Sequence, residues 1–185
     1  MTQELTLNTN RNLTLSERLS LKKSGRVLLL DVSGSMSSDC EPGKTKIDAL
    51  REVVAGIKYQ PKMFAFSSDT AECDKDTIPR PNGGTRLGRA LAYMKDKGHD
   101  KIIVITDGMV DDPDLCLEMA KKTNIQIFYI GVGEKPKFLE ELAAAAGGNF
   151  CTKEDISAGA RELQGKLQLL LGPGDSSVSG GPICL

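Results

Sequence analysis

The stretch RVLLLDVSGSM, from Arg26 to Met36, decides the fold. Its apolar residues form a continuous run instead of alternating with polar ones, which is typical of a strand buried on both faces of a parallel sheet. The run ends abruptly at Asp31, where small and polar residues take over. Similar runs at Lys101–Thr106 and Ile125–Gly131 predict two further buried strands, so the centre of the protein is expected to be a parallel sheet.

Weaker strand patterns and several helical patterns surround these three runs. Lys62–Ser67 is a shorter strand, Thr70–Cys73 is expected to pair with it antiparallel at an edge, and Asn149–Thr152 is a weak sixth strand. Helical spacing of apolar residues predicts five helices, whose patterns begin at Ile47, Leu87, Pro113, Phe138 and Asp155. Strands that alternate with helices favour an α/β, Rossmann-like doubly wound fold, with a mainly parallel central sheet, one antiparallel edge strand and helices on both faces.

The chain of 185 residues is long enough for one ordinary domain. We expect an N-terminal extension over residues 1–24, the α/β domain over residues 25–171 and a flexible C-terminal tail over residues 172–185, which is rich in Gly, Ser and Pro. The fifth helix, Asp155–Leu171, is expected to close the domain.

Charge and composition exclude several kinds of partner. The formal net charge is -1, from 24 basic and 25 acidic residues, so the chain lacks the positive field that nucleic-acid binding needs. Its apolar runs are far shorter than the roughly 20 residues of a membrane helix. The 5 cysteines are widely spaced, which favours reduced thiols. With no secretion signal visible, we expect a cytoplasmic protein that binds neither nucleic acid nor membrane.

Polar side chains gather where two of the buried strands end. Asp31 follows the first strand and Asp107 follows the Lys101–Thr106 strand, so both carboxylates are expected at the same edge of the sheet. Ser33 and Ser35 lie two and four residues after Asp31, and Thr85 opens a helix after two glycines. These donors are all oxygens, which hard cations prefer, and Mg²⁺ suits them best, with Mn²⁺ or Ca²⁺ as alternatives. Because neutral hydroxyls supply much of the shell, the cation should attract an Asp or Glu carboxylate from a partner protein.

These residues resemble the von Willebrand factor A-type (VWA) domain with a metal-ion-dependent adhesion site (MIDAS). Asp31, Ser33 and Ser35 match its D-x-S-x-S motif, Thr85 its separate threonine and Asp107 its distal aspartate, in the family's order. The resemblance covers about residues 25–171. It implies a doubly wound fold and a non-enzymatic module that binds protein ligands through the metal. The family includes intracellular members that work beside ATPases or chelatases, so an ATPase partner is one expectation.

Two alternatives remain open, a Mg²⁺-dependent phosphatase and a nucleotide-binding protein. Paired strand-end aspartates with Mg²⁺ also describe haloacid-dehalogenase-type phosphatases, but the second acid of their D-x-D motif is Ser33 here, a poor proton donor at neutral pH. The second alternative is a degenerate P-loop, because residues 38–45, SDCEPGKT, differ from the Walker A pattern only at the first glycine. A phosphate loop should follow its strand immediately, whereas this segment begins seven residues after Asp31.

Overall fold

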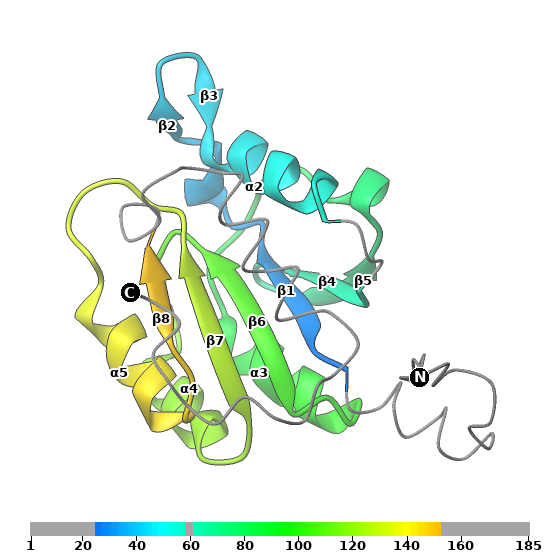
Figure 1. Ribbon diagram of the computed structural model, residues 1–185, viewed down its shortest axis with the longest axis vertical. Coiled ribbons are helices and arrows are strands. Elements are labelled where there is room, and N and C mark those ends of the chain that lie inside the picture. The colour runs from blue at the N-terminus through cyan, green and yellow to red at the C-terminus, as the bar shows by residue number, and fades with distance from the viewer. Residues whose placement is uncertain (1–24, 58–60, 153–185) are drawn as a thin grey trace, which may run out of the picture.

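The computed structural model describes residues 25–57 and 61–152. These residues form a six-stranded sheet with helices on both faces (Figure 1). The expected N-terminal extension, the expected fifth helix and the expected tail lie outside the described residues, so the predicted domain boundaries stay predictions. The described elements, apart from two short 3₁₀ turns, are β1 (Val27–Asp31), β2 (Asp39–Glu41), β3 (Lys44–Thr45), α2 (Lys46–Ala55), β4 (Met63–Phe66), β5 (Thr70–Cys73), α3 (Leu87–Asp96), β6 (Lys101–Thr106), α4 (Pro113–Ala120), β7 (Asn124–Tyr129), α5 (Lys137–Ala145) and β8 (Phe150–Thr152).

The main sheet has the order β5-β4-β1-β6-β7-β8. The neighbours from β4 to β8 pair in parallel, and β5 pairs antiparallel with β4 at the edge. This arrangement confirms the predicted α/β fold class, including the antiparallel edge strand. The central strand β1 lies between β4 and β6, with Leu30 in register with Ala65 on one side and Ile105 on the other. Its carboxyl end is therefore flanked by two other strand ends.

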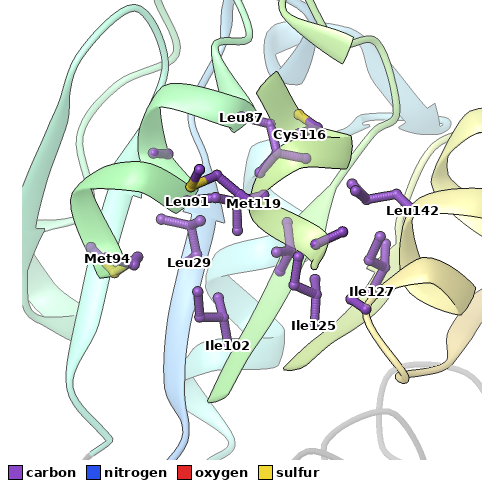
Figure 2. Packing of buried hydrophobic residues seen from close by; sticks show 14 of the residues in the cluster. Leu29, Leu87, Leu91, Met94, Ile102, Cys116, Met119, Ile125, Ile127 and Leu142 are labelled. Carbon is purple, nitrogen blue, oxygen red and sulfur yellow. The ribbon is translucent and has the colours of Figure 1, made fainter. Parts of the chain in front are cut away.

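Hydrophobic packing covers both faces of the sheet. Leu28 and Leu30 of β1 point to the face covered by α2, whereas Val27 and Leu29 point to the face that α3, α4 and α5 cover. Figure 2 shows the second face, where Leu29 lies among side chains of α3, β6 and β7. Each of these buried aliphatic side chains contributes roughly 1.5–3 kcal/mol relative to its exposure to water. The continuous apolar runs of the sequence thus exist because both faces of these strands are covered.

Helix starts follow local signals in the sequence. Thr45 caps α2 by accepting a hydrogen bond from the amide of Asp48, and the Asp48 side chain accepts one from the amide of Thr45, which together form a capping box. Pro113 lies in the first turn of α4, as predicted. In α3, a Cβ on Gly88 would lie 2.8 Å from Leu115 Cβ, so the glycine allows α3 and α4 to pack closely.

Two features differ from the expectations. Residues 38–45 include the antiparallel hairpin β2–β3, which carries no strand signal in the sequence because its strands are short and polar and none of their residues is buried. Its turn contains Gly43 at φ 75°, a conformation that favours glycine. The second difference concerns the thiols: Cys40, Cys73 and Cys116 are free, but Cys151 is disulfide-bonded, so the expectation of reduced thiols is wrong there.

Candidate metal centre

Parallel pairing of β1 and β6 brings the two predicted carboxylates to one edge of the sheet. Asp31 ends β1, and Thr106 ends β6 directly before Asp107. The Thr106 hydroxyl donates a hydrogen bond of 2.5 Å to Asp31 Oδ2, which joins the two strand ends. Asp31 is fully buried and Asp107 is buried. The predicted meeting of the two strand ends is therefore observed, and Thr106 is a supporting residue that the sequence analysis did not identify.

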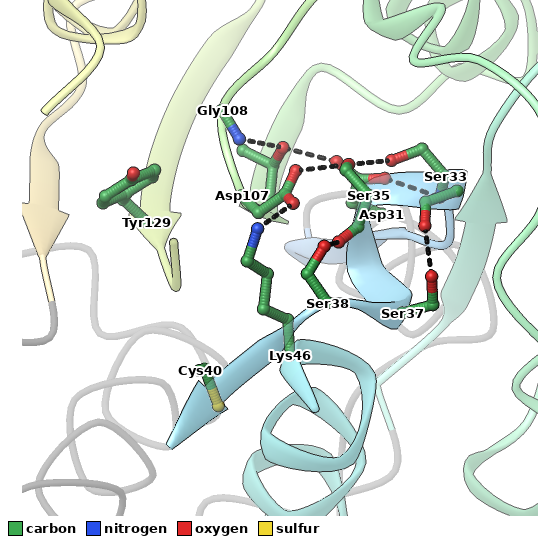
Figure 3. A network of polar contacts seen from close by, with 12 residues as sticks. Asp31, Ser33, Ser35, Ser37, Ser38, Cys40, Lys46, Asp107, Gly108 and Tyr129 are labelled. Carbon is green, nitrogen blue, oxygen red and sulfur yellow. Dashed lines mark hydrogen bonds and ion pairs between the residues drawn. The ribbon is translucent and has the colours of Figure 1, made fainter. Parts of the chain in front are cut away.

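The serines link the two aspartates through a short chain of hydrogen bonds (Figure 3). The Ser33 amide donates to Asp31 Oδ1 at 2.8 Å, which bends the chain back as it leaves β1. The Ser33 and Ser35 hydroxyl oxygens lie 3.1 Å apart, and the Ser35 hydroxyl donates to Asp107 Oδ1 at 3.0 Å. Four of the five predicted site residues therefore form one connected group of oxygen atoms.

Thr85 is held beside this group by its backbone. The Gly34 amide donates to the Gly83 carbonyl at 3.0 Å, which ties the serine turn to the Thr85 loop. The Thr85 amide donates to Asp111 Oδ2 at 2.7 Å, and the Asp111 amide donates to the Thr85 carbonyl at 2.9 Å. Among the described residues, the Thr85 hydroxyl makes no hydrogen bond to the other four site residues. Asp111 is thus a positioning residue for Thr85.

The Gly83–Gly84 pair explains why this loop can approach so closely. Gly83 has φ 75°, which favours glycine, and a Cβ on Gly84 would lie 2.4 Å from Asp111 Oδ2. Any larger residue at position 84 would push the acceptor away from the Thr85 amide. The two glycines therefore belong to the support of the site.

Lys46 adds a positive charge that the sequence analysis did not place at the site. Its ammonium nitrogen lies 2.8 Å from Asp107 Oδ2, with side-chain exposures of 15% for Lys46 and 2% for Asp107. The two residues are 61 positions apart in the chain. No local pattern predicts such a pair, because it depends on how the fold places the start of α2 relative to the residue that follows β6.

The electrostatics of Asp31 favour a cation. Burial raises the pKa of Asp31 from 3.8 to about 6, although hydrogen bonds from Ser33 and Thr106 act in the opposite direction. The nearby charge of Asp107 adds a smaller upward contribution. A carboxylate whose charge is poorly solvated gains from a cation at close range. The arrangement therefore suits a positive ion placed among Asp31, the serines and Asp107.

The donor set restricts which ion fits. Within the described residues, no group of three or more His, Cys, Asp or Glu side chains is arranged to hold a metal. An ion here would need hydroxyl oxygens besides the two carboxylates, which suits Mg²⁺ or Mn²⁺ and not a thiolate- or imidazole-seeking metal. The predicted metal residues thus fit a hard cation in type, and their role as ligands stays a prediction.

The geometry bears on the nucleotide-binding alternative and on the phosphatase alternative. The segment that resembles a phosphate loop forms the β2–β3 hairpin, and Lys44 pairs with Glu52 of α2. A P-loop requires a cradle of backbone amides between a strand and a helix, and these residues form a hairpin instead. For the phosphatase alternative, Ser33 occupies the place of the second acid and contacts Ser35.

Comparison with known proteins finds a distant sequence relative. No family model matches the chain. An uncharacterized protein from Borreliella burgdorferi is 25% identical over 150 residues, which cover 65% of this chain and 44% of the relative. The match therefore spans less than half the length of that curated relative.

Several solved structures share this fold at low sequence identity. A von Willebrand factor type A protein from Catenulispora acidiphila has a TM-score of 0.61 at 21% identity, covering 80% of this chain and 42% of that one. An aerotolerance-related membrane protein from Bacteroides fragilis has a TM-score of 0.57 at 14% identity, covering 79% and 97%. The manganese-loaded TRAP protein of Plasmodium vivax has a TM-score of 0.55 at 18% identity, covering 82% and 73%. The chain therefore has the von Willebrand factor A fold.

Proposed function

We propose that this protein is a non-enzymatic, metal-dependent binding module that captures an Asp or Glu side chain of a partner protein. Asp31, Ser33, Ser35, Thr85 and Asp107 would hold one divalent cation, with Mg²⁺ first and Mn²⁺ or Ca²⁺ as alternatives. The observation that carries the proposal is the chain of hydrogen bonds that runs from the fully buried Asp31 through Ser33 and Ser35 to Asp107. The TRAP structure of similar fold is loaded with manganese, which supports a hard divalent cation of this kind.

This chain's own residues would have distinct tasks. The buried Asp31 would supply the fixed negative charge, with its orientation set by the Ser33 amide and the Thr106 hydroxyl. The serine and threonine hydroxyls are neutral, so they would leave the charge of the ion largely uncompensated. When bound, the ion supplies an electrophilic centre that attracts an external carboxylate.

The surface around this edge suits a protein ligand. Met109 is 74% exposed and Val132 is 61% exposed, and they are the exposed large hydrophobic side chains recorded for the described residues. Each lies three positions beyond a residue of the register pair Thr106–Tyr129 of β6 and β7. Both therefore follow the strand ends at the edge that carries Asp107. We expect an acidic side chain of the partner to bind beside apolar neighbours, with an intracellular ATPase or chelatase complex as one candidate source.

The described helices and the disulfide bear on where the protein is located. Within residues 25–57 and 61–152, no helix has the length and apolar character that crossing a bilayer requires. We also propose a cytoplasmic location, which the spacing of the cysteines favours. The disulfide at Cys151 argues in the opposite direction, because disulfides are typical of oxidising compartments. Fractionation of cells expressing the tagged chain tests it.

Calorimetric titration with Mg²⁺ and Mn²⁺ tests metal binding directly. We expect saturable binding that disappears in Asp31→Ala and persists in Ser37→Ala. Ser37 is a matched control because it lies in the same 3₁₀ turn as Ser35 but donates to the Gly34 carbonyl instead of facing the aspartates. Loss of binding in both variants, or in neither, would contradict the assignment of Asp31.

A pull-down from native lysate tests partner capture. The wild-type chain should retain a partner in Mg²⁺ and lose it in chelator, and Asp31→Ala should retain none in either buffer. Capture that chelator does not change would contradict metal dependence. Turnover of phosphomonoesters or ATP by the purified chain that disappears in Asp31→Ala would favour an enzyme instead.

A further inference from the structure

We infer that Lys46 is an internal counter-cation that competes with the bound metal for Asp107 and lowers the metal affinity of the site. The inference rests on the proposed metal site. Its basis is the ion pair of 2.8 Å between Lys46 Nζ and Asp107 Oδ2, which is largely withdrawn from water on both sides. The family resemblance of the site residues does not include this lysine.

Local structure fixes Lys46 over the site. It is the first residue of α2, immediately after the capping residue Thr45. Its amide donates to the Ser38 carbonyl at 3.0 Å, which ties the start of α2 to the end of the serine turn. This hydrogen bond fixes the backbone of Lys46 beside the serine turn, and its side chain reaches Asp107 as Figure 3 shows.

A neighbouring lysine shows that this pair is unusual. Lys44 lies two residues earlier and pairs with Glu52, with side-chain exposures of 32% and 54%. Such exposed pairs contribute little and are screened by salt. The Lys46–Asp107 pair has exposures of 15% and 2%, so its charges interact through a medium with less water. Lys44 therefore provides a matched control of the same residue type.

Each carboxylate oxygen of Asp107 accepts a hydrogen bond from a side chain of this protein. Oδ1 accepts from the Ser35 hydroxyl and Oδ2 accepts from Lys46. A dication placed among the serine hydroxyls either shares Asp107 with the ammonium, where like charges repel, or displaces it and breaks the ion pair. Both outcomes make metal binding less favourable and so raise the Kd for the metal. Without the metal, Lys46 offsets the repulsion between Asp107 and Asp31.

The experiment is a calorimetric titration of the full chain with Mn²⁺ alone at low ionic strength. Lys46→Met removes the charge but keeps an unbranched apolar side chain, and we expect its Kd to be about tenfold lower than that of the wild type. Lys46→Arg keeps the charge and should stay within about threefold, because the repulsion persists. Lys44→Met should leave the Kd unchanged. Near-ultraviolet circular dichroism checks folding, and Lys46→Gln replaces Lys46→Met if that variant does not fold.

The outcomes separate this inference from the proposed function. A Kd for the charge-removing variant that is equal to or higher than the wild-type value overturns the role of Lys46 while the metal site stands. Binding by that variant alone supports the competition but overturns metal dependence of the wild-type chain. Absence of binding in every variant overturns both.

Discussion

Replacing Asp31 with asparagine should stabilise the metal-free protein while it abolishes metal binding. The side chain is fully buried, and burial raises the pKa of Asp31 from 3.8 to about 6. At 1.36 kcal/mol for each pKa unit, keeping this carboxylate charged in the fold costs about 3 kcal/mol at pH 8. An asparagine carries no such charge, and its oxygen can still accept from the Ser33 amide while its amide donates to Thr106 Oγ1.

The same shift fixes the sign of the pH dependence. Because the pKa of Asp31 is higher in the folded protein than in the unfolded chain, the folded protein binds the proton more tightly. The stability that the protonated Asp31 gives to the wild type is therefore lost as the pH rises from about 4 through about 6. The difference between the asparagine variant and the wild type should be largest above pH 7 and should disappear near pH 4.

Urea denaturation in chelator at pH 8, 6 and 4 measures this difference. We expect Asp31→Asn to unfold at higher urea than the wild type at pH 8, by up to about 3 kcal/mol in unfolding free energy. Addition of Mg²⁺ should stabilise the wild type alone. An asparagine variant that is less stable than the metal-free wild type at pH 8, or a difference that does not change with pH, would refute the reasoning about a desolvated charge.

Three further substitutions test the support of the site and the packing of the fold. Asp111→Ala removes the acceptor for the Thr85 amide, so we expect about 1–3 kcal/mol lower stability in urea and weaker metal binding by calorimetry, with Asp111→Asn closer to wild type. Gly88→Ala places a Cβ 2.8 Å from Leu115 Cβ and should lower stability by about 1–3 kcal/mol in thermal melts, and an unchanged Tm would argue against close helix packing there. Thr45→Ala removes the cap of α2 and should cost about 1 kcal/mol in urea, with no effect if the cap is unformed in solution.

The sheet and most helices could be predicted because their signals are local. The run before Asp31 is continuous since both faces of β1 are covered, and the two aspartates meet since parallel strands end at one edge. Strand ends differ from the predictions by a residue or two, as at β7, because the edge of an apolar run does not mark the last ladder hydrogen bond.

The supporting residues could not be predicted because their partners are distant in sequence. Thr106 continues an apolar run and carries no signal that it will donate to Asp31, 75 positions away. Asp111 follows the pattern of a helix-start residue, although its side chain accepts from the Thr85 amide. Lys46 has the sequence context of an exposed first-turn residue, and only the packing of α2 brings it to Asp107. Motif spacing thus indicates the candidate metal ligands. It does not indicate the residues that position these ligands or the lysine that pairs with one of them.

A crystal grown in Mn²⁺, with anomalous diffraction collected at the manganese edge, tests the central claim most directly. We predict one anomalous peak within coordinating reach of oxygens from Asp31, Ser33, Ser35, Thr85 and Asp107, at the edge of the sheet where β1 and β6 end. A fully loaded crystal with no peak there, or a peak that none of these side chains contacts, would contradict the account.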